Sequence, residues 1–256
     1  MTLSDRILDT LFRGSELVQQ IQCLKLPRNS LGNKGIETLF SSTRLRHIRR
    51  LDISSNNIVG EEGGRIIAKS QAFPQLVSMD LRLNRLGAEG FRALVQTKEY
   101  PCLTDLKVDK NKLQDEGAQQ LVQICNLMEL QVLKLRANDI EVKGAQFIAN
   151  SYAVRQLTVL DLSENQILDE GFRHLTAASY LSNLHKLYVN DAGLTHVAAK
   201  HLKDSRFLGK LRVLSLGKNS LKEEGAIALA QSANLDMLIE LVLNDNEIKE
   251  EGVDAI

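Results

Sequence analysis

The side chains that could carry out catalysis or bind a metal form no familiar arrangement in this sequence. The five histidines are His47, His174, His185, His196 and His201, and they include no HExxH pair. His196 and His201 are five residues apart, a poor spacing for two ligands on one helix face. A GxxxxGK(S/T) phosphate loop and a GxSxG nucleophile motif are also lacking. We therefore predict that the chain is not an enzyme and uses no metal or cofactor.

The cysteines point to a reducing compartment. Cys23, Cys102 and Cys125 are odd in number and lack CxxC spacing, so each is predicted to be a free, neutral thiol. The first residues, MTLSDRILDTLFRGSE, do not read as a basic segment followed by an apolar one, so no signal peptide is expected. We expect a cytoplasmic protein, or one in the host cytosol if it is a secreted effector.

Composition excludes several classes of partner. The 256 residues contain 32 Lys and Arg against 32 Asp and Glu, so the chain has no overall attraction for nucleic acid or an anionic membrane. Aromatic residues make up 4% and Trp is absent, which leaves few platforms for stacking bases. No apolar run approaches the roughly 18 residues of a membrane span. We predict a protein partner, with no nucleic acid, membrane or small-molecule substrate.

A repeated sequence pattern predicts the strands and helices that must position any functional residue. The pattern LxxLxLxxNxL, with small variations, begins at positions 21, 48, 76, 103, 130, 157, 184, 211 and 238. A period of about 27 residues indicates a stack of similar structural units. Leucines that alternate with polar residues predict a short strand, and the xEGAxxL segment that follows predicts a helix. Because parallel strands stack more closely than helices, we predict an α/β solenoid of about nine repeats, a horseshoe with a concave parallel sheet and convex helices.

One repeat breaks the pattern. Most repeats carry an asparagine at the ninth motif position, and a buried amide there can both donate to and accept from backbone groups of the turn. We predict that this ladder is structural. In LHKLYVNDAGLTHVAAKHL the ladder position is Ala192 and the usual helix glycine is Ala198, whereas Asn190 and Asp191 stand just before the lapse. The same repeat carries Tyr188, flanked by His185 and Lys186.

Nine such motifs resemble leucine-rich repeats, and the xEGAxxL helices are similar to the ribonuclease-inhibitor-like subfamily. That repeat style is also found in the sensor ends of NOD-like receptors, in Ran GTPase-activating proteins and in effectors that bacteria inject into host cells. Those families tend to use slightly longer repeats, and the period here departs from them. The resemblance implies a protein-protein interaction module that binds its partner on the concave face, as an inhibitor of a partner enzyme, an effector or a regulator. The alternative is a GTPase activator of the Ran type, although the acidic tail of that family is not seen.

The candidate contact residues lie on the predicted concave face. At the fifth, seventh and eighth motif positions the first five repeats carry seven bases and three acids, and the last four carry one base and four acids. Such a bipolar surface can orient a partner. Tyrosine within a polar surface is a common hot spot, so Tyr188 is the leading contact. The predicted protein-binding residues are Tyr188, His185, Lys186, Lys107, Lys110, Lys134, Arg136, Asp161, Glu164 and Asp191.

The ends of the repeat array predict the domain organisation. Residues 1–20 are expected to form an N-terminal capping helix, because SDRILDTLF begins with a Ser N-cap and then places apolar residues at helical spacing. Residues 21–256 are expected to form one array of leucine-rich repeats. Its last repeat stops at EEGVDAI, so we predict that it is incomplete and that its C-terminal cap is missing.

Overall fold

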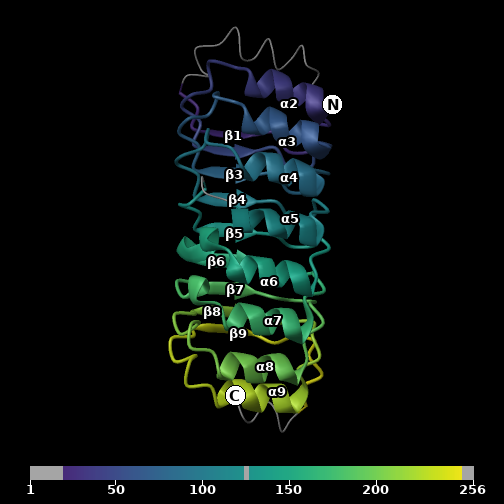
Figure 1. Ribbon diagram of the computed structural model, residues 1–256, viewed down its shortest axis with the longest axis vertical. Helices are drawn as coiled ribbons and strands as arrows, with labels where there is room; N and C mark the ends of the chain where they lie inside the picture. Colours follow the sequence, from purple (N-terminus) through teal and green to yellow (C-terminus); the bar gives the residue numbers. More distant parts are fainter. Residues whose placement is uncertain (1–19, 124–126, 250–256) are drawn as a thin grey trace.

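The computed structural model describes residues 20–123 and 127–249, which form one regular stack of coils (Figure 1). Each coil contributes a three-residue strand and, in the first eight, a helix. The strands are β1 (Cys23–Lys25), β2 (Arg50–Asp52), β3 (Ser78–Asp80), β4 (Asp105–Lys107), β5 (Val132–Lys134), β6 (Val159–Asp161), β7 (Lys186–Tyr188), β8 (Val213–Ser215) and β9 (Glu240–Val242). The helices are α2 (Gly32–Phe40), α3 (Gly60–Ala68), α4 (Gly87–Val95), α5 (Gln114–Gln120), α6 (Val142–Asn150), α7 (Leu168–Thr176), α8 (His196–Lys203) and α9 (Lys222–Ala230). Short 3₁₀ turns follow three of them: η2 (Leu121–Gln123), η3 (Tyr152–Gln156) and η4 (Ser179–Leu181).

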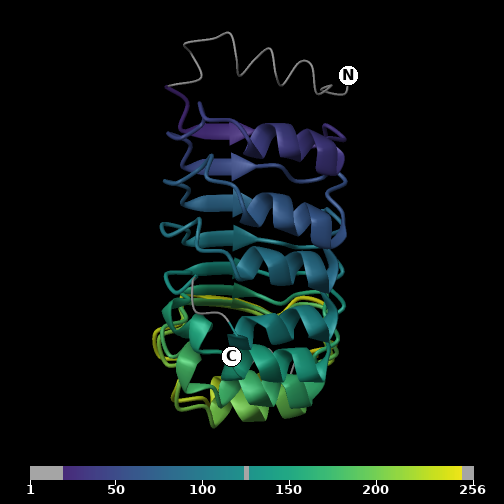
Figure 2. The ribbon, with the colours of Figure 1, turned by 45° about the horizontal axis from the view of Figure 1, so that its top comes forward.

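The strands form one parallel sheet in sequence order, from β1 to β9. Their register joins equivalent motif positions, so Leu133 pairs with Leu160, and Leu160 pairs with Leu187. These leucines are fully buried between the sheet and the helices. The stack curves, with the sheet on its inner side and the helices on its outer side (Figures 1 and 2). The predicted α/β horseshoe is therefore confirmed.

Except in the coil that carries Ala192, the asparagine ladder connects each coil from the second onward to the one before it, as predicted. Asn165 Oδ1 accepts hydrogen bonds from the backbone N–H groups of Asn138 at 2.9 Å and Ile140 at 3.0 Å. Its Nδ2 donates to the carbonyl oxygens of Leu135 at 3.0 Å and Leu162 at 2.9 Å. The side chain is 1% exposed, so it satisfies backbone groups that water cannot reach.

A second ladder, which we did not predict, lies just after the helices. The hydroxyl of Ser151 donates to the Leu121 carbonyl oxygen at 2.5 Å, and that of Ser205 donates to the Thr176 carbonyl oxygen at 2.6 Å. The Thr97 hydroxyl makes the equivalent bond to the Ala68 carbonyl oxygen at the end of α3, in the preceding coil. These hydroxyls satisfy carbonyl groups at the ends of the neighbouring helices, which have no partner within their own helix.

The coil that lacks the ladder asparagine is joined to its neighbours by other bonds. With Ala192 in place of Asn, the N–H of Ile167 donates to the carbonyl oxygen of Asn165 at 2.9 Å. Thr195 caps α8 by accepting from Val197 N–H at 3.2 Å, and its own hydroxyl donates to Asp169 Oδ2 at 2.6 Å. The lapse is thus a local change of hydrogen bonding within an intact stack.

Two predictions on the ends lie outside the described residues: the capping helix of residues 1–20, apart from its last residue, and the incomplete last repeat with its missing cap. Across the described part of the chain, no helix is both long and apolar enough to span a membrane.

Candidate protein-binding surface on the inner sheet

The inner face of the sheet brings the predicted contact residues into adjacent rows. The register pairs Lys107 with Lys134, Lys134 with Asp161, and Asp161 with Tyr188. Because alternate side chains of a strand point to opposite faces, all four project away from the buried leucines. The row is therefore a continuous strip of two cations, one carboxylate and one phenol.

A shallow pocket of about 340 Å³ opens at the ends of β6 to β9, and we name it the inner pocket. Five predicted residues line it: Arg136, Asp161, Glu164, Tyr188 and Asp191. The rest of the lining is Ser163, Asn190, Ser215, Gly217, Lys218, Val242 and Asn244. The other five predicted residues are outside the lining. Lys107, Lys110 and Lys134 lie in the coils beside it, while His185 and Lys186 lie at the start of β7.

Charges at the edge of the inner pocket are paired between coils, which the sequence count did not reveal. The Arg136 guanidinium donates to Glu164 Oε1 through Nε at 2.9 Å and through Nη2. Lys110 Nζ lies 3.9 Å from the other oxygen of Glu164. The bond from Arg136 lowers the pKa of Glu164, so this carboxylate stays ionised. The positive and negative halves of the surface therefore meet in a cluster of ion pairs.

Further along the sheet, a second cluster joins Arg82 to two buried aspartates. Arg82 Nη2 lies 2.7 Å from Asp80 Oδ2, and Arg82 Nε lies 4.0 Å from Asp109 Oδ2. Asp109 Oδ1 also accepts the backbone N–H of Arg136 at 3.0 Å. Three of the seven bases counted on this face, Arg82, Lys110 and Arg136, are thus paired with neighbouring acids.

Tyr188 is half-buried at the centre of the inner pocket and lies in a negative field. Burial raises the pKa of its phenol, and the charges of Glu240 and Asp161 raise it further. Asp161 accepts a hydrogen bond from Ser163 N–H at 3.1 Å, and Asp191 is exposed. An aromatic face beside carboxylates is a suitable environment for a cationic side chain.

Asn190 fixes the floor of the inner pocket. Its Oδ1 accepts from the Ser215 hydroxyl and from Gly217 N–H, each at 2.7 Å, and its Nδ2 donates to the Ser163 hydroxyl at 3.2 Å. A Cβ atom on Gly217 would lie 2.5 Å from Asn244 Oδ1, so a side chain there would crowd this floor. Asn190 therefore crosslinks the strand ends of three successive coils.

A further row of the inner face was missed. The third motif position is two residues before the fifth, so the same alternation places it on the same side of the sheet. In the fifth to ninth repeats it holds Val132, Val159, Lys186, Val213 and Glu240, of which Lys186 alone was among the predicted contacts. The signal was present in the strand period, and the row places a valine beside Lys134 and another beside Asp161, but Lys186 beside Tyr188.

Comparison with known proteins agrees with this architecture. The family model for the leucine-rich repeat matches residues 44–68, 101–122, 155–173 and 210–230. The crystal structure of InlP from Listeria monocytogenes superposes with a TM-score of 0.57 at 18% sequence identity. The chain contains leucine-rich repeats and has the leucine-rich-repeat fold. The alignment with InlP covers 94% of this chain but only 58% of that one, and at such identity it shows the fold alone. No curated protein sequence matches, and the ribonuclease-inhibitor-like subfamily stays a prediction.

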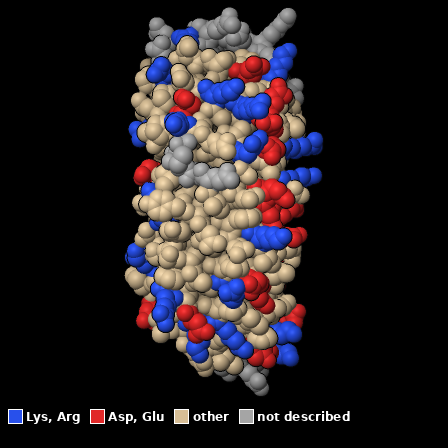
Figure 3. Space-filling model, viewed as in Figure 1, with Lys and Arg blue, Asp and Glu red and all other residues tan. Residues whose placement is uncertain are grey.

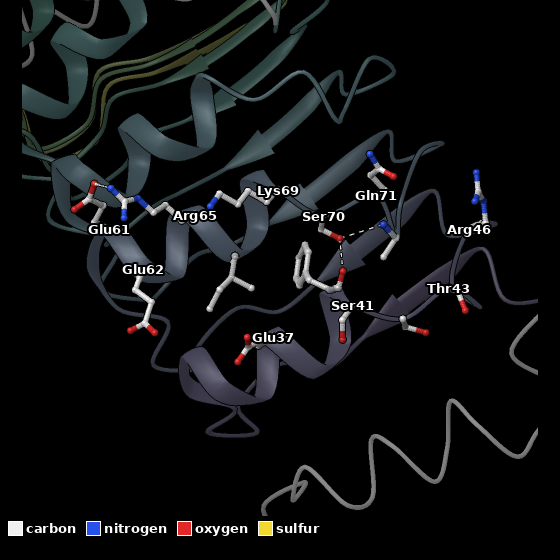
Figure 4. A pocket seen from close by; sticks show the side chains of 14 residues that line it. Glu37, Ser41, Thr43, Arg46, Glu61, Glu62, Arg65, Lys69, Ser70 and Gln71 are labelled. Carbon is white, nitrogen blue, oxygen red and sulfur yellow. Dashed lines mark hydrogen bonds and ion pairs between the residues drawn. The ribbon is translucent and has the colours of Figure 1, made fainter.

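A larger cavity of about 720 Å³ lies on the helix side, between α2 and α3 (Figure 4). No predicted contact residue lines it, and Arg65 already pairs with Glu61 at 2.6 Å. In Figure 4, Glu37 and Glu62 lie at one end and Arg46 at the other, so the lining converges on no single ligand chemistry.

Within residues 20–123 and 127–249, no three His, Cys, Asp or Glu side chains lie close enough together to hold a metal ion. Cys23 and Cys102 are free thiols. The inner pocket thus offers hydrogen bonds, ion pairs and one aromatic ring, which are the means of binding a protein surface.

Proposed function

We propose that this protein binds a protein partner across the inner face of its sheet, with a basic side chain of the partner held in the inner pocket. Leucine-rich-repeat proteins generally act as protein-interaction modules. The observation that supports this particular surface is Tyr188, a half-buried ring that lies between the charges of Asp161 and Glu240. A cation above such a ring gains both a charge–quadrupole and a charge–charge interaction.

Arg136 and Lys218 at the edge of the inner pocket direct the approach of the partner. Arg136 is held by Glu164, whereas Lys218 is exposed. A partner that places an acid over Lys218 and a base over Tyr188 would match this order of charges. Complementarity of this kind sets orientation and association rate more than affinity. A partner enzyme bound in this way would have its own surface covered, which supports a role as an inhibitor or regulator, and the free thiols support action in a reducing compartment such as the cytoplasm.

The experiment is capture of partners from cell lysate, their identification by mass spectrometry, and measurement of affinity with the purified partner. We expect Tyr188→Ala and Asp161→Lys each to weaken binding by about tenfold or more, because both remove interactions at the centre of the contact. Ile227→Ala on α9 is the control, because Ile227 is an exposed apolar residue on the helix side. Partners that bind both pocket variants as tightly as the unaltered protein would contradict the proposal.

A further inference from the structure

Exposed aromatic rings gather at one place, and it is away from the inner pocket. Tyr152 in η3 is 53% exposed and Tyr180 in η4 is 39% exposed. Their ring centroids lie 5.6 Å apart with planes at 84°, an edge-to-face contact. By contrast, Phe73, Phe91 and Phe172 are fully buried. Holding two tyrosines in solvent has no role in the core, so their exposure calls for another explanation.

A guanidinium group is stacked on this pair. The Arg155 Cζ atom lies 4.2 Å from the centroid of the Tyr152 ring, a cation–π geometry. Its Nη1 donates to the Tyr152 carbonyl oxygen at 3.4 Å and approaches Met128 Sδ at 3.7 Å. No carboxylate of the described residues lies within ion-pair distance of it. The group is therefore oriented by the ring and lacks an anionic partner within this part of the chain.

Lys210 is a charged residue near these three: its Nζ donates to Asn183 Oδ1 at 2.8 Å, and Asn183 Nδ2 donates to the Arg155 carbonyl oxygen at 2.9 Å. Figure 3 shows almost no blue or red atoms across the middle of the molecule, to the left of α5 and α6 as Figure 1 labels them. Nearby exposed residues include Val122 at 44%, Gln156 and Ser179. The centres of protein interfaces are enriched in Tyr, Met and Arg, which are the residue types found here.

We propose that Tyr152, Tyr180 and Arg155 form a second docking surface, for a protein partner that presents a carboxylate beside an apolar or aromatic side chain. A stacked guanidinium offers a planar pair of N–H donors, which matches the two oxygens of a carboxylate. The tyrosine rings supply the apolar contact around that ion pair. A phosphate of nucleic acid fits less well, because such a ligand selects a strip of several cations, whereas Arg155 is the one cation stacked on a ring among the described residues.

This surface is separate from the proposed inner-pocket contact. The η3 and η4 turns precede β6 and β7, whereas the inner pocket lies at the ends of those strands. The chain would therefore hold two partners at once, a basic group at Tyr188 and an acidic group at Arg155. It would then act as a bridge between two proteins, which goes beyond the binding function proposed above.

A display library of random peptides tests the proposal. We expect selection on the unaltered protein to enrich acidic peptides that contain an apolar residue. Their affinity, measured with synthetic peptides by fluorescence polarisation, should fall by about tenfold or more in Tyr152→Ala, Tyr180→Ala and Arg155→Lys. Tyr152→Phe should retain binding because it keeps the ring. Ile227→Ala is a matched control, because Ile227 is also 39% exposed.

The outcomes separate the two surfaces. Peptides that are lost only in Tyr188→Ala would overturn this proposal and support the inner pocket. Failure to enrich acidic peptides, or enrichment of peptides insensitive to the Tyr152, Tyr180 and Arg155 variants, would overturn it as well. Single-stranded RNA that binds the unaltered protein and is lost in Tyr152→Ala would assign the surface to nucleic acid instead. Circular dichroism of each variant checks that the fold is retained.

Discussion

Asp109 is a carboxylate that the coil structure holds almost out of water. It is 8% exposed, and this burial raises its pKa to about 6, from 3.8. The negative charge of Asp161 also raises this pKa. The hydrogen bond from the Arg136 N–H and the positive charges of Arg82 and Lys134 lower it, but by less than burial raises it. Because the folded state holds this proton more tightly than the unfolded state, the free energy of unfolding should fall as pH rises from 3.8 to about 6.

Replacing Asp109 by Asn should remove that part of the pH dependence. Asn keeps an oxygen for the Arg136 N–H and has no charge to bury, so the variant should be roughly 1 kcal/mol more stable at pH 7. Urea unfolding at several pH values between 4 and 7 measures this difference. Asp236→Asn, at an exposed aspartate, is the control. A variant whose unfolding free energy keeps the same slope with pH would contradict the assignment.

Restoring the ladder asparagine tests how well the irregular coil has adapted. In Ala192→Asn, the new amide should accept from Ile167 N–H, which now bonds Asn165 O within its own turn. Since that N–H is already satisfied, the gain should be at most about 1 kcal/mol. Asn138→Ala, which removes a complete ladder member, should cost about 2–4 kcal/mol because buried backbone groups lose their partners. If thermal unfolding showed that Ala192→Asn stabilises the fold as much as Asn138→Ala destabilises it, backbone groups of the irregular coil would still lack hydrogen-bond partners.

At the scale of the helices, the contact between α3 and α4 depends on glycine. A Cβ atom on Gly64 would lie 2.1 Å from the Gly90 carbonyl oxygen, so the two backbones touch where no side chain fits. Gly64→Ala should push the helices apart and destabilise the fold by about 1–3 kcal/mol. Gly209→Ala is the matched control, because its Cβ would meet nothing closer than 3.9 Å. If thermal unfolding showed the same loss of stability in Gly64→Ala and Gly209→Ala, this explanation of the glycine contact would be wrong.

The elements themselves were largely predictable, because each strand and helix is fixed by a local pattern that recurs in every repeat. The alternating leucines predicted a strand in each of the nine repeats, and each repeat has one. The hydroxyl ladder of Ser151 and Ser205 could not be predicted from the sequence. Its hydroxyls donate to carbonyl groups of the preceding coil, and only the structure shows that these lie within reach. The close approach of Gly64 to Gly90 depends on how neighbouring coils tilt, and that is set by packing beyond any one repeat.

For the whole molecule, the sequence predicted the inner face but could not show how its charges combine. Counting bases and acids treats each repeat alone, whereas the Arg136–Glu164 and Arg82–Asp109 contacts form between repeats. The Tyr152–Tyr180 pair was missed for a similar reason. The two rings belong to successive repeats and meet only because the coils stack.

Balanced charge should make copies of the chain attract one another at low salt. The 32 basic and 32 acidic residues cancel at pH 7, so net repulsion is absent, while the inner face stays positive toward β1 and negative toward β9. Light scattering should give a negative second virial coefficient in dilute buffer that rises as salt is added, since opposite charges are then screened. Lys143→Glu, at an exposed position on α6, adds net charge and should raise the coefficient at low salt. Attraction that strengthens with salt would instead indicate apolar contacts, such as those of Ile239, which is 77% exposed.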